Sequence, residues 1–237
     1  MALDGYCETM CGRFALQASP EQVKALFAYQ EHPNFPPRAN IAPTEPIAIV
    51  VREGGQNHFH LMRWGFLPAW VKDPQDFPLI INARTETLAE KPAYRTAIRH
   101  RRGLVPADAF YEWKRDGKIK TPFKIMRDDG GLFAMAALWE TYADKNGSEI
   151  DTAAIITCAP NECAAELHDR MPAIIEPAQF DLWLDHSVAP DEALRLLKPA
   201  HGAWRAEPVD PRTPRPERPA KKAATPKPDK PAQGELF

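Results

Sequence analysis

The sequence contains no apolar run of about 18 residues, the length that a membrane-spanning helix needs, so no membrane insertion is expected. Its first ten residues include Asp4 and Glu8 and lack a basic start and an apolar stretch, which argues against a secretory signal. Four cysteines in 237 residues are too few for a disulfide framework. We therefore expect a protein of the reducing cytoplasm.

Net charge is also nearly absent. The formal value is −2, so overall charge gives no indication of a nucleic-acid partner. The sequence has no glycine-rich phosphate loop, and the spacings Cys7 to Cys11 and Cys158 to Cys163 fit zinc sites poorly. We expect no metal and no cofactor, and nothing in the sequence suggests more than a monomer.

Three segments differ in composition. Residues 1–10 have no structural pattern and are interpreted as an extension outside the mature protein. Residues 11–204 contain most of the hydrophobic residues, which make up 44% of the chain, and are expected to fold as one domain. Residues 205–237 are rich in Pro, Lys, Arg, Ala and Glu and cannot bury enough apolar surface, so a disordered tail is predicted.

Local patterns predict many strands and a few helices. Ser19-Pro20-Glu21-Gln22 has a cap, a first-turn proline and a capping-box Gln, which together indicate a helix start. Further helices are expected at 161–167, 176–184 and 190–197, and strands at 46–51, 58–64, 78–81, 103–113, 121–126, 131–138 and 152–157. This order predicts an α+β fold with a mixed or antiparallel, barrel-like β core and several flanking helices.

Cys11 directly follows a methionine. If translation begins at Met10, or if the preceding segment is removed, Cys11 gains a free amine beside its thiol. Such a pair condenses with an aldehyde to an imine and closes to a thiazolidine, and the open form of an abasic deoxyribose is such an aldehyde. A terminal amine has a pKa near 8, so part of it is neutral at pH 7. The alternative is an ordinary buried cysteine.

Three further polar residues stand in or beside apolar segments. Asn82 follows the run 79–81 and either orients a nucleophile or makes a turn. Glu112 lies between Tyr111 and Trp113, so it is either a buried acid–base group with a raised pKa or a residue on the wet face of a strand. His168 ends a short helix and either transfers protons at a sugar or merely interacts with the helix dipole.

A basic stretch runs from Arg84 to Arg102, and the aromatic segment Trp64–Trp70 precedes it. Cations near aromatic side chains are typical of surfaces that bind unstacked single strands, although basic helix faces are often only solvated.

Together these segments resemble the SOS-response-associated peptidase family, the abasic-site processing proteins, from Cys11 to about Ala206. The resemblance rests on ordered motifs: Met10-Cys11-Gly12-Arg13-Phe14, Arg38-Ala39-Asn40-Ile41-Ala42-Pro43-Thr44, Arg63-Trp64-Gly65-Phe66-Leu67-Pro68, Ile81-Asn82-Ala83-Arg84-Thr85-Glu86, the run 101–114 and His168-Asp169-Arg170-Met171-Pro172. It implies an SRAP-like fold that senses abasic sites in single-stranded DNA and forms a thiazolidine crosslink, with possible lyase and autoproteolytic activity. It also implies work at the nucleoid during repair.

The resemblance implies a role for each matching residue. Cys11 would form the crosslink, Asn82 would orient it, Glu112 would act as acid and base, and His168 would act on the sugar. Phosphate contacts would come from Arg13, Arg84, Arg95 and Arg99, and the kinked strand would be lined by Asn40, Trp64 and Phe66. In the family the cysteine directly follows the initiator methionine, whereas nine residues precede Met10 here. We therefore expect either that Met10 is the true start or that the extension is removed.

The last five residues, Gln233-Gly234-Glu235-Leu236-Phe237, resemble peptides that dock on the bacterial sliding clamp through a glutamine and a terminal Leu-Phe pair. The sequence thus predicts single-stranded DNA with abasic sites as one partner and the clamp as another. Two alternatives stay open: a cysteine peptidase acting on other proteins, and a non-catalytic module that binds single strands.

Overall fold

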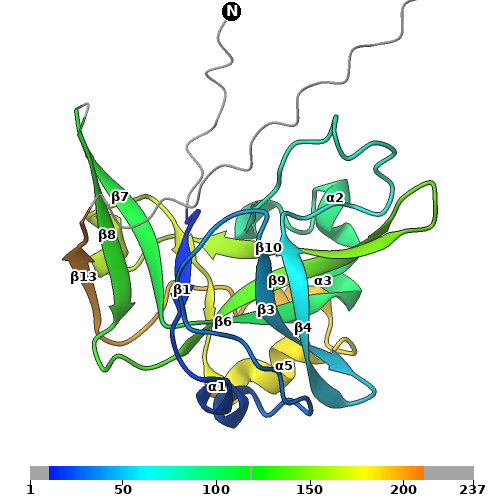
Figure 1. The fold of residues 1–237 in the computed structure, drawn as a ribbon, viewed down its shortest axis with the longest axis horizontal. Coiled ribbons are helices and arrows are strands. Elements are labelled where there is room, and N and C mark those ends of the chain that lie inside the picture. The colour runs from blue at the N-terminus through cyan, green and yellow to red at the C-terminus, as the bar shows by residue number, and fades with distance from the viewer. Residues whose placement is uncertain (1–10, 118, 211–237) are drawn as a thin grey trace, which may run out of the picture.

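The computed structural model describes residues 11–117 and 119–210, and these form two β-sheets around a shared core, with short helices at the periphery (Figure 1). The smaller sheet contains β1 (Phe14–Leu16), β2 (Arg38–Ile41), β7 (Ala109–Asp116), β8 (Ile119–Arg127) and β13 (Trp204–Pro208). The larger sheet contains β3 (Pro46–Glu53), β4 (Gln56–Trp64), β5 (Asn82–Arg84), β6 (Arg102–Ala107), β9 (Phe133–Ala143), β10 (Glu149–Cys158), β11 (Met171–Pro172) and β12 (Ile174–Ile175).

Strand order runs β13-β8-β7-β1-β2 in the smaller sheet and β11-β10-β4-β3-β6-β9-β12 in the larger one, with β5 beside β10. Most pairs are antiparallel, but β10 runs parallel to both β4 and β5. The helices are α1 (Pro20–Phe27), α2 (Pro92–Arg95), α3 (Ala97–His100), α4 (Glu162–Ala165), α5 (Phe180–Leu184) and α6 (Pro190–Leu194), with 3-10 turns η1 (Thr85–Thr87) and η2 (Pro177–Gln179). The predicted α+β fold with a mixed, barrel-like core is confirmed.

One continuous segment joins the two sheets. β6 ends at Ala107 in the larger sheet and β7 begins at Ala109 in the smaller one, so the chain bends at Asp108. The Asp108 carboxylate accepts the backbone N–H groups of Gln17 and Ala18, the latter at 3.1 Å, so the bend also pairs two donors of the segment that follows β1. The single strand expected at 103–113 is therefore two strands that belong to different sheets.

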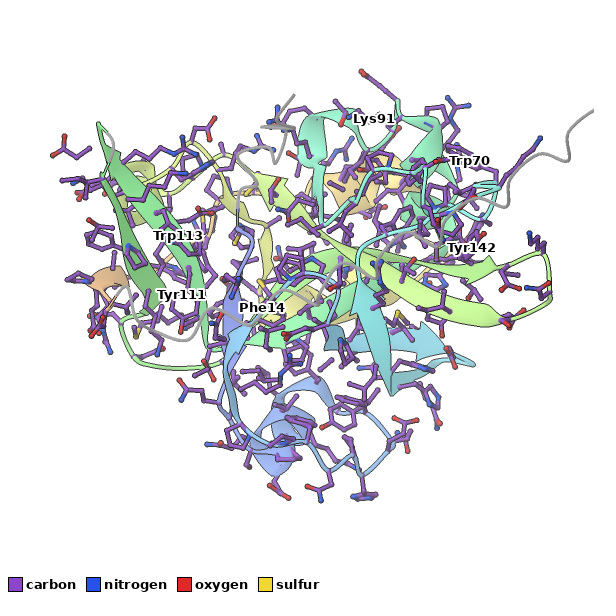
Figure 2. All side chains as sticks on the ribbon, turned by 45° about the horizontal axis from the view of Figure 1, so that its top comes forward. Phe14, Trp70, Lys91, Tyr111, Trp113 and Tyr142 are labelled. Atoms are coloured by element: carbon purple, nitrogen blue, oxygen red, sulfur yellow. The ribbon has the colours of Figure 1, made fainter. Side chains whose placement is uncertain are left out.

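The space between the sheets is filled by aromatic and branched side chains. Phe14 lies near the middle of the molecule, where the sheets meet (Figure 2), and its ring centroid is 5.3 Å from that of Trp64 in an edge-to-face contact. Gly65 follows Trp64 with φ of +151°, and a Cβ there would lie 2.6 Å from both Arg63 and Leu79. Glycine thus lets the chain turn out of β4 without displacing its neighbours.

The local predictions for helices and strands are mostly confirmed. Ser19 accepts the Gln22 N–H while the Gln22 side chain accepts the Ser19 N–H, so α1 starts with the expected capping box. The strand expected at 78–81 is wrong, because this segment makes only an isolated bridge from Ile80 to Phe66 before β5 begins. The helix expected at 176–184 divides into η2 and α5.

The folded part also extends further than composition indicates. The expected boundary at Trp204 is wrong, because β13 runs to Pro208 and pairs with β8 along its whole length. A short edge strand needs only backbone partners, so it can form where few large apolar residues exist. Residues 1–10 and 211–237, which include the predicted extension and the clamp peptide, lie outside the described residues. None of the described helices is long and apolar enough to cross a membrane.

Candidate active site

Cys11 and Glu112 meet at the start of β1. Phe14 pairs with Phe110, and the Tyr111 N–H donates to the Arg13 carbonyl at 2.9 Å, which sets the register between β1 and β7. This register brings the Cys11 backbone nitrogen within 2.5 Å of Glu112 Oε1. Both residues are buried, with exposed fractions of 1% and 2%. The alternative that strand alternation places Glu112 on a wet face is therefore wrong.

Burial sets the charge of both groups. Loss of hydration, with a smaller effect from the negative charge of Asp169, raises the pKa of Glu112 to about 8. Burial also raises the pKa of the Cys11 thiol well above its usual range, and the nearby Glu112 charge adds to this. At neutral pH Glu112 thus holds a proton next to the Cys11 nitrogen, and Cys11 is a thiol rather than a thiolate.

His168 lies between α4 and β11, the latter a strand of the larger sheet. It follows α4, whose first turn is capped by Asn161, and its N–H donates to the Ala164 carbonyl at 2.9 Å. His168 Nδ1 lies 2.8 Å from Asp169 Oδ1 and accepts the Arg170 N–H at 3.1 Å. The charge of Asp169 contributes to the raised pKa of Glu112, so the Asp169 carboxylate lies near that of Glu112. The segment that carries His168 thus brings one charged side chain, Asp169, into the surroundings of Glu112.

Asn82 begins β5, half-buried beside Ile155 of β10. The preceding carbonyl, that of Ile81, accepts the Trp64 indole N–H at 2.8 Å, while the Trp64 ring packs on Phe14. Through Trp64, the strand that follows Cys11 is held against the strand that begins at Asn82.

Trp64 and Phe66 were predicted to line bound DNA, and this prediction is wrong for both. Each side chain is fully buried, Trp64 between β1 and β5 and Phe66 against Tyr94 at 5.7 Å, so neither can stack on a base. The exposed aromatic residue of this segment is Trp70, which is 60% exposed and packs edge-on against Phe77 (Figure 2). The sequence feature that could have indicated this exposure is Pro68, because a proline ends strand pairing and so predicts that Trp70 lies in a loop.

The predicted phosphate contacts lie in three places. Arg13 donates to Asn40 Oδ1 at 3.0 Å, which links β1 to β2, and both side chains are half-buried. Arg84 is exposed at the end of β5. Arg95 and Arg99 are exposed on α2 and α3. The four arginines carry the positive charge that a phosphate contact requires, whereas Asn40 is uncharged.

The last two arginines of the predicted basic stretch already have partners within the fold, and only Arg102 is buried. Arg102 is fully buried, where its guanidinium donates to the carbonyls of Trp183 at 2.6 Å and Ile98 at 2.8 Å. Arg101 pairs with Glu140 and lies over the Trp139 ring at 5.1 Å. These two arginines stabilise the fold, since their charges are already satisfied within it. Among residues 11–117 and 119–210, no three His, Cys, Asp or Glu side chains gather as metal ligands would.

Comparison with known proteins identifies relatives along most of the chain. Residues 10–215 match the family model described as SOS response associated peptidase (SRAP). The chain is 38% identical over 195 residues to the abasic site processing protein YoaM of Bacillus subtilis, covering 80% of this chain and 86% of YoaM. It is 32% identical over 193 residues to YedK of Escherichia coli, covering 79% and 85% of the two chains, and YedK is also named an abasic site processing protein.

A vertebrate relative and a solved structure extend the likeness. HMCES of Xenopus tropicalis, another abasic site processing protein, is 28% identical over 236 residues, covering 80% of this chain and 70% of HMCES. A crystal structure of a protein from Bacteroides thetaiotaomicron superposes with a TM-score of 0.78 at 26% identity, covering 85% of this chain and 93% of that one. The length of the match and the shared fold agree, and the chain belongs to the SOS response associated peptidase family.

Proposed function

We propose that this protein recognises abasic sites in single-stranded DNA and traps them covalently through Cys11. Three of its relatives are named abasic site processing proteins. The observation that carries the proposal is the 2.5 Å separation between the Cys11 nitrogen and Glu112 Oε1, with both residues buried. A carboxyl group in that place can exchange a proton with the nitrogen once that nitrogen is an amine.

The reaction requires Cys11 to be the first residue, because an amide nitrogen cannot condense with an aldehyde. Two observations support a mature chain that starts there. The family match begins at Met10. Cys11 also has φ of +44°, a left-handed conformation that costs a non-glycine residue about 1–2 kcal/mol. Removal of the preceding peptide bond abolishes that constraint, so cleavage before Cys11 relieves local strain.

The trapping step balances as follows. The Cys11 amine attacks the aldehyde carbon of the open sugar to give a carbinolamine. Glu112 donates its proton to the hydroxyl group, which leaves as water, and the resulting carboxylate then takes the N–H proton of the iminium, so that the neutral imine forms and Glu112 is protonated again. The Cys11 sulfur then adds to the imine carbon, and its proton passes to the ring nitrogen to give the thiazolidine. The net change is loss of one water, and Glu112 returns to its starting state.

His168 is proposed to act on the sugar. A closed abasic sugar must lose its hydroxyl proton and protonate its ring oxygen before an aldehyde is exposed, and an imidazole can do both near neutral pH. The same group can remove a proton from the carbon next to the imine, which expels the 3′ phosphate and cleaves the strand. Lyase activity would thus share this site with trapping.

The DNA strand would be held by exposed cations and one aromatic side chain. Arg84 lies two residues after Asn82 and is exposed. Trp70 presents an apolar ring on which an unstacked base can lie. Arg95 and Arg99 would extend the phosphate contacts, and such a protein would work at the nucleoid in the cytoplasm.

A peptidase acting on other proteins is less well supported. Cysteine peptidases need a thiolate, which a lowered pKa supplies. Burial raises the pKa of the Cys11 thiol, the opposite direction. The thiazolidine route needs no free thiolate before the imine forms, so it suits this environment better.

The test compares two forms of the protein with single-stranded DNA that carries one abasic site. One form begins at Cys11 and the other retains residues 1–10. We expect a heat-stable adduct, with the mass of protein plus DNA less one water, only from the form that begins at Cys11. Cys11→Ala in that form abolishes the adduct, whereas Cys163→Ala, at a half-buried cysteine on α4, retains it. Equal crosslinking by the extended form would overturn the proposal.

The clamp contact is a separate proposal, since Gln233, Leu236 and Phe237 lie outside the described residues. Deletion of residues 233–237 should abolish pull-down by the sliding clamp and leave adduct formation unchanged. Undiminished pull-down would rule this contact out.

A further inference from the structure

An ion pair connects the two segments that carry Asn82 and His168. Arg170 Nη1 lies 2.5 Å from Glu86 Oε1, and Nη2 lies 2.7 Å from Oε2. The guanidinium and the carboxylate therefore meet in a two-pronged arrangement, the geometry that fixes both partners most strongly. Arg170 Nη2 also donates to the Thr157 carbonyl at 2.7 Å. We call this contact the Glu86–Arg170 bridge.

The strand topology makes the bridge important, because it connects the two short strands that flank the end of β10. β10 ends between two short strands: β5 pairs with it through Arg84 opposite Thr157, and β11 pairs with it through Pro172 opposite Thr157. β5 pairs with β10 at three residues, and β11 pairs with β10 at two. Neither short strand is therefore firmly fixed by sheet pairing alone. The bridge crosses the end of β10 and ties the two outer segments together.

Each end of the bridge lies next to a proposed functional group. Glu86 sits in η1, two residues after Arg84 and four after Asn82. Arg170 is two residues after His168, and its N–H donates to His168 Nδ1 at 3.1 Å. The Arg170 side chain is only 12% exposed, while that of Glu86 is 56% exposed. The bridge thus positions both segments and neutralises a carboxylate close to the place where a phosphate would lie.

We propose that Glu86 and Arg170 are positioning residues: their bridge holds the Asn82 and His168 segments in the relative placement that trapping of an abasic site requires. This inference rests on the proposed function and goes beyond it, because it assigns the pair a role in the rate of reaction rather than in DNA affinity. The mutual contact also holds the pKa of Glu86 near 2, so the bridge persists across the whole range in which the protein could act.

The competing role for Arg170 is a direct phosphate contact, and the two roles predict opposite effects for Glu86. A positioning bridge predicts that Glu86→Gln slows trapping even though it removes a negative charge near the DNA. A direct phosphate contact predicts that Glu86→Gln tightens binding and leaves trapping unchanged or faster, because Arg170 is released toward the phosphate.

The experiment uses the form that begins at Cys11 and single-turnover trapping of an abasic single strand, with protein in excess. The maximal rate and the half-saturating concentration are measured for Glu86→Gln, Arg170→Gln, the double variant and Arg170→Lys. We expect each single variant to lower the maximal rate roughly 10- to 100-fold, as a small misplacement of reacting groups does. The half-saturating concentration should change less than about threefold for Glu86→Gln.

Two comparisons separate positioning from general instability. The double variant should be no slower than either single variant, because both changes remove the same contact. Arg170→Lys, which keeps the charge but not the two-pronged geometry, should restore only part of the rate. Asp181→Asn breaks another arginine–carboxylate pair, with Arg52 at 2.5 Å between β3 and α5, and should trap at the normal rate.

A failure of the bridge proposal is distinguishable from a failure of the function. No adduct from the unsubstituted form refutes the proposed function itself. A normal adduct from that form, together with an unchanged maximal rate for Glu86→Gln or additive losses in the double variant, overturns the bridge. Thermal melting of every variant verifies that the rates refer to folded protein.

Discussion

The two sheets supply halves of the candidate site that differ in solvation. The smaller sheet contributes Cys11 and Glu112, which are buried and make a single close polar contact with each other. The larger sheet contributes His168 with Asp169 and the Glu86–Arg170 bridge, where charged groups are partly exposed and paired. One half is thus dry and keeps its carboxyl group protonated near neutral pH, whereas the other, wet half is partly hydrated and keeps the Glu86 carboxylate ionised.

The difference corresponds to two chemical tasks. Imine formation needs a group that still holds a proton near neutral pH, and burial provides this for Glu112. Holding a polyanion and opening its sugar need charges that stay ionised and accessible, which a desolvated pocket does not allow. In the proposed reaction, the two sheets would each supply one of these environments.

The largest expected effect is on the dry half. Glu112→Gln removes the proton donor and acceptor next to the Cys11 nitrogen and keeps the shape. We expect the maximal trapping rate of the form that begins at Cys11 to fall about 100- to 10,000-fold. Binding of single-stranded DNA without a lesion should stay unchanged. Single-turnover kinetics and a binding titration measure the two quantities.

A matched control is Glu140→Gln, which alters another buried carboxyl group, on β9, that pairs with Arg101. Its trapping rate should remain close to normal. Equal losses in both variants would mean that the dry half contributes only packing.

Sequence alone predicted the fold class and one half of the site better than the other. The position of Glu112 between two aromatic residues left burial and exposure equally open, and the structure decides for burial, with Glu112 on the strand that pairs with β1. The Glu86–Arg170 bridge could not be predicted, since its partners are 84 positions apart and meet only through the pairing of β5, β10 and β11. Trp64 and Phe66 were placed on the DNA surface because aromatic residues suit both stacking and cores, and sequence does not distinguish the two at a strand end.

The second prediction concerns stability and pH. In the chain that retains residues 1–10, Glu112 has a folded pKa of about 8 against an ordinary value of 4.5. The folded state therefore binds more protons than the unfolded state between these values, and its stability is full below pH 4.5 and falls as pH rises to 8. The loss is at most about 1.4 kcal/mol for each pH unit crossed.

Denaturant unfolding at pH 5 and pH 8 measures this loss. Glu112→Gln should remove most of the difference between the two values, whereas Asp129→Asn, at an exposed carboxylate, should leave it in place. If both variants kept the full difference, Glu112 would not be the group that titrates, and the dry half would lose its defining property.

The third prediction tests the connection between the halves. Trp64→Phe removes the indole N–H that donates to the Ile81 carbonyl next to Asn82. We expect a loss of about 1 kcal/mol in stability, because the Ile81 carbonyl loses one of its two donors and keeps the Ile155 N–H, and a several-fold slower trapping rate. Trp183→Phe is the matched control, since that indole donates to the Gly103 carbonyl at 2.9 Å and is also fully buried. A similar stability loss without a change in rate is expected there, and slower trapping by both variants would show that Trp64 has no special place.

The smallest expected effect belongs to a single exposed charge in the wet half. Arg84→Gln removes one cation at the end of β5 and no packing. If Arg84 contacts one phosphate, the slope of log affinity against log salt for single-stranded DNA should decrease by about 0.7, and the maximal trapping rate should change less than about twofold. Arg195→Gln, at another exposed arginine directly after α6, should leave the slope unaltered. An unchanged slope for Arg84→Gln would move the DNA path away from β5, and the wet half would then serve the sugar alone.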